Sequence, residues 1–201
     1  MNQTVSLDDI RQGNVKDLVG ANLAGVDLSG VDLSGVNLSQ ANLMGVNLSG
    51  ANLRGATLRA NLRGADLTGA DLTNADCRNA DLRGAILLDI DANNISLAGA
   101  FLAGTVLTHL DLTGVDFRGC DLRGATLTGT ILQQADLSNC NLSGADLSQA
   151  DLEEAILDRS LLRGANLSGT NLLCAQVQDV DLEGVLFNKT CLEGTSLIVN
   201  S

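Results

Sequence analysis

Apolar and polar residues alternate along almost the whole chain in units of five. We call the central residue of each unit position i. It recurs every fifth residue from Leu23 to Leu58 and again from Leu62 to Leu197. Leu fills 31 of these 36 positions, a small or aliphatic residue usually fills i−2, and Asp or Asn usually fills i−1. Each unit therefore reads as a short extended segment with two side chains directed inward and one outward.

A turn must follow each extended segment, because the period is odd and a straight strand would direct the next central Leu outward. Of the 22 glycines, 21 lie at i+2. That position is the third of the turn, where a type II turn needs the positive φ that Gly adopts readily. A chain that turns in the same way at every unit winds into a coil, and each coil must pair with the next. The pattern predicts an all-β solenoid.

The units ADLTG, ANLSG, ADLSQ and VDLSG resemble the A(D/N)LXX motif of pentapeptide repeat proteins, in the Leu-centred form that is common in cyanobacteria. The resemblance covers about residues 16–199. It implies a right-handed quadrilateral parallel β-helix with four units in each coil. On that basis we expect about nine coils, stacked over ~43 Å at the spacing of paired strands.

The N-terminal residues 1–15 are expected to form a cap on this solenoid. A short helix is predicted at residues 6–13, because Ser6 and Asp9 have nearly the spacing of a capping box and Gly13 is a suitable stop. Terminal coils of a solenoid need such a cover over their apolar floor.

The C-terminus has no comparable cap. An open strand edge invites pairing with another chain, so we expect either an end-to-end homodimer or a frayed, solvated end. The residues at this edge are Leu192, Leu197, Ile198 and Val199.

Two irregularities interrupt the repeat. Between Leu58 and Leu62 one unit has only four residues, as if the corner glycine after Arg59 were missing. We predict a tightened corner at Leu58, Arg59 and Ala60, with local strain or a bulge there and the core otherwise preserved. At residues 88–98, Ala92 replaces the central Leu, so this segment is either a seam between two joined arrays or a worn repeat.

Composition narrows the range of partners and compartments. The net charge of −12 opposes direct binding to nucleic acid or to anionic membranes. The five cysteines include no C-x-x-C pair, which favours reduced thiols over a disulfide framework. The sequence shows no signal peptide and no apolar run of the ~20 residues that a membrane helix needs. We therefore expect a cytoplasmic protein.

No residue set suggests catalysis, a cofactor or a metal ion. The only histidine, His109, occupies a corner and has no partner at a ligand spacing. The G-x-x-x-x-G matches lack the Lys-Ser/Thr pair of a phosphate loop. Cys120 and Cys140 are both at i−2 and 20 residues apart, so we expect them to be stacked in the core as buried thiols, with a disulfide or metal pair as the alternative.

Two functional hypotheses remain. The first is a non-enzymatic interaction or scaffold module with an unidentified protein partner. Its contact site would be the apolar residues at outward positions, Ile86, Leu88, Phe101 and Val106.

The alternative is DNA mimicry, since some pentapeptide repeat proteins bind DNA gyrase as acidic rods. The charge density argues against it. A net charge of −12 along ~43 Å is about one charge per ~3.6 Å, whereas duplex DNA has one per ~1.7 Å. Eight of the ten arginines, at i+1, dilute the negative field further.

Overall fold

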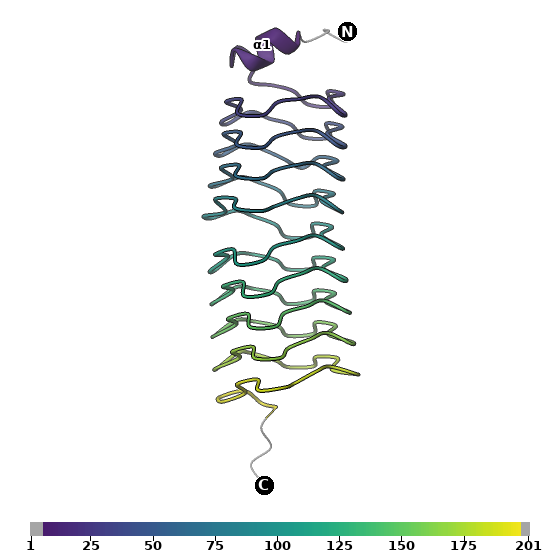
Figure 1. Cartoon of the computed structure of the whole chain (residues 1–201), viewed down its shortest axis with the longest axis vertical. Helices are drawn as coiled ribbons and strands as arrows, with labels where there is room; N and C mark the ends of the chain where they lie inside the picture. Colours follow the sequence, from purple (N-terminus) through teal and green to yellow (C-terminus); the bar gives the residue numbers. More distant parts are fainter. Residues whose placement is uncertain (1–5, 198–201) are drawn as a thin grey trace.

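The computed structural model of the chain describes residues 6–197, which form a short helix and, following it, one stack of coils (Figure 1). The helix, α1, spans Leu7–Arg11. Its first turn is capped by Ser6, whose hydroxyl oxygen accepts a hydrogen bond from the Asp8 N–H at 3.2 Å. Ile10 is only 1% exposed and joins the core, so the helix covers the apolar floor of the first coil.

The coils are joined by isolated parallel β-bridges between i−1 residues, and the described residues contain no longer strand. The partners are usually 20 residues apart, which is four units, so each coil has four sides. We number the sides from 1 to 4 in chain order. Their first bridges are Asp17↔Asn37 on side 1, Asn22↔Asn42 on side 2, Asp27↔Asn47 on side 3 and Asp32↔Asn52 on side 4. The predicted β-helix is confirmed.

The corners explain the polar positions of the repeat. The side chain at i−1 accepts a hydrogen bond from the backbone N–H at i+1, as Asp27 does from Ser29 at 3.1 Å. Asp and Asn are suited to this role because their short side chains reach the backbone two residues on. The i+2 residue has positive φ even where it is not Gly, as at Gln149 (φ 60°).

The four-residue unit turns its corner with a different hydrogen bond. The Ala60 N–H donates to the Leu58 carbonyl oxygen at 2.7 Å, which closes a three-residue γ-turn around Arg59. Leu58 stays in the core and is 1% exposed. The bridges of this one coil join residues 19 apart, from Asn42↔Asn61 to Thr57↔Asp76, and the spacing then returns to 20. The deletion therefore shortens one coil without disturbing its neighbours.

A second irregularity lies in the middle of the stack, where one coil-to-coil contact is loosened. The Leu67 N–H donates to the Ile86 carbonyl at 2.9 Å, and the Leu107 N–H donates to the Thr126 carbonyl at 2.8 Å. Between residues 84–95 and residues 103–116, all of them described, none of the corresponding backbone hydrogen bonds has normal geometry, although Ile86↔Val106 and Ser96↔Asp116 still pair as bridges. We call this stretch the open junction. It overlaps the segment 88–98 that the sequence marked as irregular.

The corner geometry leads to a test of stability. An L-residue with φ near +60° costs about 1–2 kcal/mol relative to the right-handed region, and Gly avoids most of that cost. We expect Gln149→Gly to raise the free energy of unfolding by about 0.5–1 kcal/mol, as measured by urea denaturation.

Ala24→Gly is the matched control, because Ala24 lies at i+1 of a corner and is not among the residues with positive φ. It should lower the free energy of unfolding by about 0.5–1 kcal/mol. Equal effects of the two changes would show that backbone strain at i+2 is not what limits stability.

Candidate interaction surface

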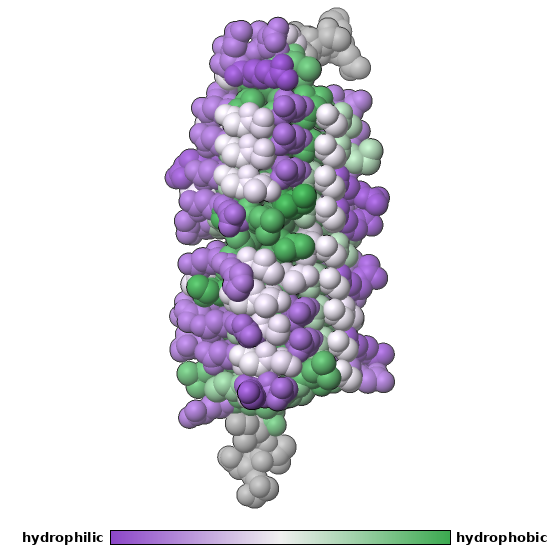
Figure 2. Space-filling view, viewed as in Figure 1, coloured by the Kyte–Doolittle hydropathy of each residue, from purple (hydrophilic) through white to green (hydrophobic). Residues whose placement is uncertain are grey.

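The central patch consists of Ile86, Leu88, Phe101 and Val106, the four exposed apolar residues that the sequence singled out. Ile86 and Val106 form a parallel bridge on side 3, and Leu88 follows Ile86 at the next outward position. Ile86 is 42% exposed and Val106 is 38% exposed. Figure 2 shows an apolar patch at mid-length, with further apolar areas near both ends of the rod. Three members of the patch therefore share one side of the rod.

The fourth member of the central patch, Phe101, lies on side 2 and is 45% exposed. The guanidinium of Arg83 lies over its ring, 5.7 Å from the ring centroid. A cation over an aromatic face at this distance is attracted to the ring and partly covers it. Phe101 and Arg83 therefore form an aromatic–cation pair on side 2, next to the side that carries the aliphatic residues.

Other exposed apolar residues lie outside the central patch. Ile131, on side 4, is 39% exposed and was not singled out in the sequence, although it occupies an i−1 position where Asp or Asn is usual. That substitution was the signal that could have found it. Met44 and Val19 are exposed near the N-terminal end, and Leu161 and Leu186 in the C-terminal half. These residues are spaced singly along the rod, as is normal for a protein surface.

The C-terminal end of the described stack exposes residues that are buried in every other coil. Phe187 occupies a central position and is nevertheless 38% exposed, because no further coil covers it. Leu192 and Leu197 are half-buried against the core. The other two residues of the expected dimer edge, Ile198 and Val199, lie outside the described residues. The sequence-based prediction missed Phe187 because it considered only the last strand.

Arginines neutralise many of the outward carboxylates. In four units the Arg at i+1 binds the Asp at i−1 of its own unit, as Arg83 binds Asp81 through Nε at 2.8 Å and through Nη2. Others bind across coils: the Arg59 guanidinium donates to Asp76 at 2.6 Å, and Arg54 donates to Asp71 at 3.0 Å. These pairs are largely exposed, so each contributes only about 0–1 kcal/mol to stability. Their larger effect is on the field of the rod, which they weaken at mid-length.

The corner hydrogen bonds lower the pKa of many carboxyl groups. The Arg83 side chain bonded to Asp81 holds the pKa of that carboxyl below its usual value, with the backbone N–H of Arg83 adding to the effect. The Thr68 hydroxyl and backbone N–H lower the pKa of Asp66 in the same way. These carboxylates are thus fixed as hydrogen-bond acceptors for the turns and are not poised to transfer protons.

The cysteines are all free thiols. Cys120 and Cys140 are buried, and each thiol donates to a backbone carbonyl of the preceding coil at 2.9 Å, Cys120 to Leu97 and Cys140 to Phe117. The contact with Cys140 and burial both raise the pKa of the Cys120 thiol, and burial raises that of Cys77 to about 12. The core thiols are therefore unreactive, while Cys174 and Cys191 are exposed.

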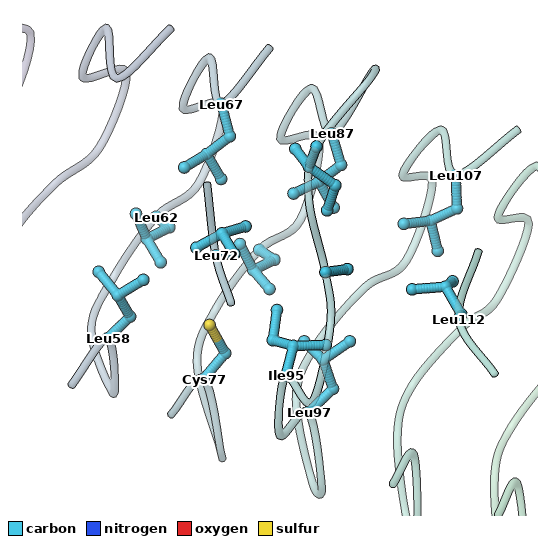
Figure 3. Close-up of a pocket in the computed structure, with 13 residues that line it drawn as sticks. Leu58, Leu62, Leu67, Leu72, Cys77, Leu87, Ile95, Leu97, Leu107 and Leu112 are labelled. Carbon is cyan, nitrogen blue, oxygen red and sulfur yellow. The ribbon is translucent and has the colours of Figure 1, made fainter. Parts of the chain in front are cut away.

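Neither His109 nor a cavity offers a site for chemistry. The His109 ring lies against Gly129 in the next coil, where a Cβ atom would come within 2.5 Å of the ring. Within residues 6–197 no three His, Cys, Asp or Glu side chains are placed to hold a metal ion. A cavity in the core is lined only by apolar residues, and its water-accessible volume is about 10 Å³ (Figure 3). That volume holds at most one water molecule.

No helix among the described residues is long and apolar enough to cross a membrane.

The fold and the surface define a β-helical solenoid with flat polar sides, an aliphatic core and one apolar patch at mid-length. The sequence matches the pentapeptide repeats family in eight copies, over residues 21–59, 59–89, 86–124, 120–159 and 160–197. These segments span most of the chain, which therefore belongs to the pentapeptide repeat family, whose fold is a right-handed β-helix. A comparison with curated proteins gave no match.

Solved structures of other pentapeptide repeat proteins resemble this one. HetL, a pentapeptide repeat protein involved in heterocyst differentiation regulation from the cyanobacterium Nostoc sp. strain PCC 7120, is 33% identical. The match covers 89% of this chain and 84% of HetL, with a TM-score of 0.56. A pentapeptide repeat protein from the Arabidopsis thaliana thylakoid lumen is 33% identical over 61% of this chain and 73% of its own, with a TM-score of 0.23. QnrB1, a plasmid-mediated fluoroquinolone resistance protein, is 17% identical over 88% of each chain, with a TM-score of 0.35.

The hydrogen-bonded carboxylates lead to a prediction about pH. Asp81 has a pKa that is lower in the folded chain than its ordinary value. Its ionised form therefore adds stability above about pH 4, and this stability is lost as the pH falls through the folded-state pKa. We expect the free energy of unfolding to be nearly constant from about pH 5 to pH 8 and to decline below about pH 4.

Asp81→Asn tests the assignment, because Asn fills the same position of side 2 at Asn61 and at Asn141. The variant keeps the acceptor for the turn and loses the charge. It should be less stable than the parent at neutral pH, and the difference should shrink at about pH 3, where this carboxyl takes up a proton in the unfolded chain and the ionised form no longer favours the folded state as strongly. A difference that is the same at both pH values would exclude this carboxyl as a source of the pH dependence.

Proposed function

We propose that this protein is a non-enzymatic interaction module, rigid on either side of the open junction, whose contact site is the central patch. The observation that carries the proposal is the contact between Ile86 and Val106, exposed apolar residues on adjacent coils of a side that is polar on both flanks. The preceding residue of the column is Asp66 and the following one is Thr126. Adjacent exposed apolar residues of this kind are typical of contact sites.

The rod around the patch suits this role. About nine coils would give a rod ~43 Å long, with regular sides onto which a partner can dock without rearrangement. The partner most compatible with the patch is a protein with an apolar surface, because the Arg83 guanidinium beside Phe101 is already paired with Asp81. The free thiols fit a reducing compartment and support a cytoplasmic location.

The ion pairs weigh against DNA mimicry as the function. Arg78, Arg83, Arg118 and Arg123 each bind an aspartate of their own unit, so the middle of the rod alternates in sign. A DNA mimic needs a continuous negative surface. A gyrase supercoiling assay with the purified protein should therefore show neither inhibition nor protection at micromolar concentration.

An affinity experiment tests the central patch. The tagged protein and its Val106→Asp variant would be used to capture partners from the source cell, followed by quantitative mass spectrometry. Thr126→Asp is the matched control, since it places the same charge at the next position of the same side. Asp is native at this position in Asp66 and Asp146, so the fold should tolerate it. We expect one set of partners to be retained by Thr126→Asp and lost by Val106→Asp. Identical sets for all three proteins would exclude the patch.

We also propose that two copies associate through their C-terminal coils. Phe187, Leu192 and Leu197 would be covered in such a dimer, and the unpaired edge of the last coil would find a partner. Sedimentation velocity should show a dimer for the parent and a monomer for Leu192→Asp. Leu161→Asp, which changes a residue that is 42% exposed on side 2, should leave the dimer intact. A monomeric parent at about 100 μM would exclude an end-to-end dimer of useful affinity.

A further inference from the structure

The open junction separates two blocks that are otherwise bonded in the same way. Before it, the Ile86 N–H donates to the Ala65 carbonyl at 2.9 Å, and after it the Thr126 N–H donates to the Thr105 carbonyl at 2.9 Å. Between these bonds, the Val106 N–H and the Leu87 N–H have no backbone partner of normal geometry among the described residues. The coils remain adjacent, because Ile86 and Val106 still pair as a bridge by a looser criterion.

The gap covers sides 3 and 4 and ends at the start of side 1, where the Asp116 N–H also lacks its bond to the Ile95 carbonyl. On side 2, the Leu82 N–H still donates to the Phe101 carbonyl at 2.8 Å, and the Phe101 N–H donates to the Ala80 carbonyl at 2.9 Å. Bonding resumes on side 1, where the Leu97 N–H donates to the Asp116 carbonyl at 3.1 Å. The two blocks are therefore joined along one edge of the coil and parted along the opposite edge.

An inverted unit explains where the junction opens. Most other units of side 4 have Ala, Val or Thr at i−2 and Leu at the centre, as in Ala70-Asp71-Leu72. At the junction it reads Ile90-Asp91-Ala92, with the large residue in the narrow i−2 slot and the small one at the centre. The next coil also has a large residue in that slot, Leu110. Two large residues stacked in a slot built for Ala push the coils apart, because cores do not absorb added volume freely.

The core cavity lies where the inverted unit has a small residue, Ala92, at the central position that Leu usually fills. Ala92, between Leu72 and Leu112 in the column of central residues, lines the cavity together with both of these residues. Leu87 and Leu107, on the two sides of the junction, also line it (Figure 3). A central Leu at residue 92 would occupy this space, so the cavity and the overfilled slot have the same origin.

Thr105 makes a hydrogen bond that differs from those of two other threonines at i−2. Thr130 and Thr170 occupy i−2 as Thr105 does, and their hydroxyls donate to carbonyls 23 residues earlier, in the preceding coil. The corresponding acceptor for Thr105 would be Leu82. Thr105 instead donates within its own coil, to the Leu102 carbonyl at 2.7 Å. Thr195, at i−2 near the C-terminal end of the described stack, bonds within its own coil in the same way, to the Leu192 carbonyl at 2.7 Å, so the hydrogen-bond gap and the cavity carry the inference.

We propose that the open junction is a hinge, about which the N-terminal and C-terminal blocks of the rod move as rigid bodies. The axis lies along the edge that keeps its hydrogen bonds, near Phe101, and the opening lies on sides 3 and 4. Backbone N–H and C=O groups that lack a protein partner must be reached by water, and water can enter only where the coils part. The remainder of the solenoid stays closed because each coil is bonded to the next. This inference does not depend on the proposed function.

Amide hydrogen exchange measured by NMR tests the hinge in the unmodified protein. The amides of Leu87, Ala92, Val106 and Asp111 should exchange at least about tenfold faster than their counterparts one coil away, Leu67, Leu72, Thr126 and Ile131. The counterparts have the same position in the unit and donate hydrogen bonds to a neighbouring coil, and rates are compared as protection factors, which correct for residue type. Equal protection in the two groups would overturn the proposal.

A double substitution tests whether the inverted unit causes the junction to open. Ile90→Ala combined with Ala92→Leu restores the usual order of small and large residues without departing from the family pattern. Protection at Leu87 and Val106 should rise to within about threefold of the counterparts. The reciprocal control, Ala150→Ile with Leu152→Ala, inverts a regular unit of side 4 and should accelerate exchange there while leaving the native junction unchanged. Unchanged exchange at the junction in the first variant would exclude the inverted unit as the cause.

Discussion

Pairing of backbone groups between successive coils is the constraint on which the rest of this structure depends. A coil of four short units cannot satisfy its own N–H and C=O groups, so each coil must keep the register of its neighbour. Regular corners maintain that register, and Asp or Asn at i−1 maintains the corners through a bond to the backbone. Exposed carboxylates are therefore a structural requirement of the repeat before they are a source of surface charge. The arginines beside them limit the repulsion that such a column would otherwise produce.

The two irregularities of the chain show how much the register can tolerate. Removing one residue at the corner of Arg59 is accommodated by a γ-turn, because Leu58 and Ala60 still point inward and the next coil is unaffected. The inverted unit at Ala92 keeps the chain length, yet it opens the stack. A change in side-chain volume inside the solenoid is thus more disruptive than a change in chain length at its surface, since the surface corner can relax and the core cannot.

Most of the fold could be predicted from the sequence, because the period, the central Leu and the corner Gly all point to one architecture. The tightened corner at Arg59 could also be predicted, because the sequence itself shows apolar residues alternating through Ala56, Leu58, Ala60 and Leu62. The open junction was recognised only as an irregular segment. Its hydrogen bonds depend on how Ile90 and Leu110 stack in adjacent coils, which is a packing property of residues 20 apart. The division of the central patch between sides 2 and 3 likewise needed the coil register.

The central claim is that coil-to-coil hydrogen bonding is continuous from Lys16 to Glu193 except across the open junction. Scalar couplings transmitted through hydrogen bonds, measured by NMR between amide nitrogen and carbonyl carbon, observe these bonds one at a time. The account predicts a coupling from Leu67 to Ile86, another from Leu107 to Thr126, and none from Leu87 to Val106. A coupling between Leu87 and Val106 equal to the other two would show that the stack is closed throughout and would contradict the account.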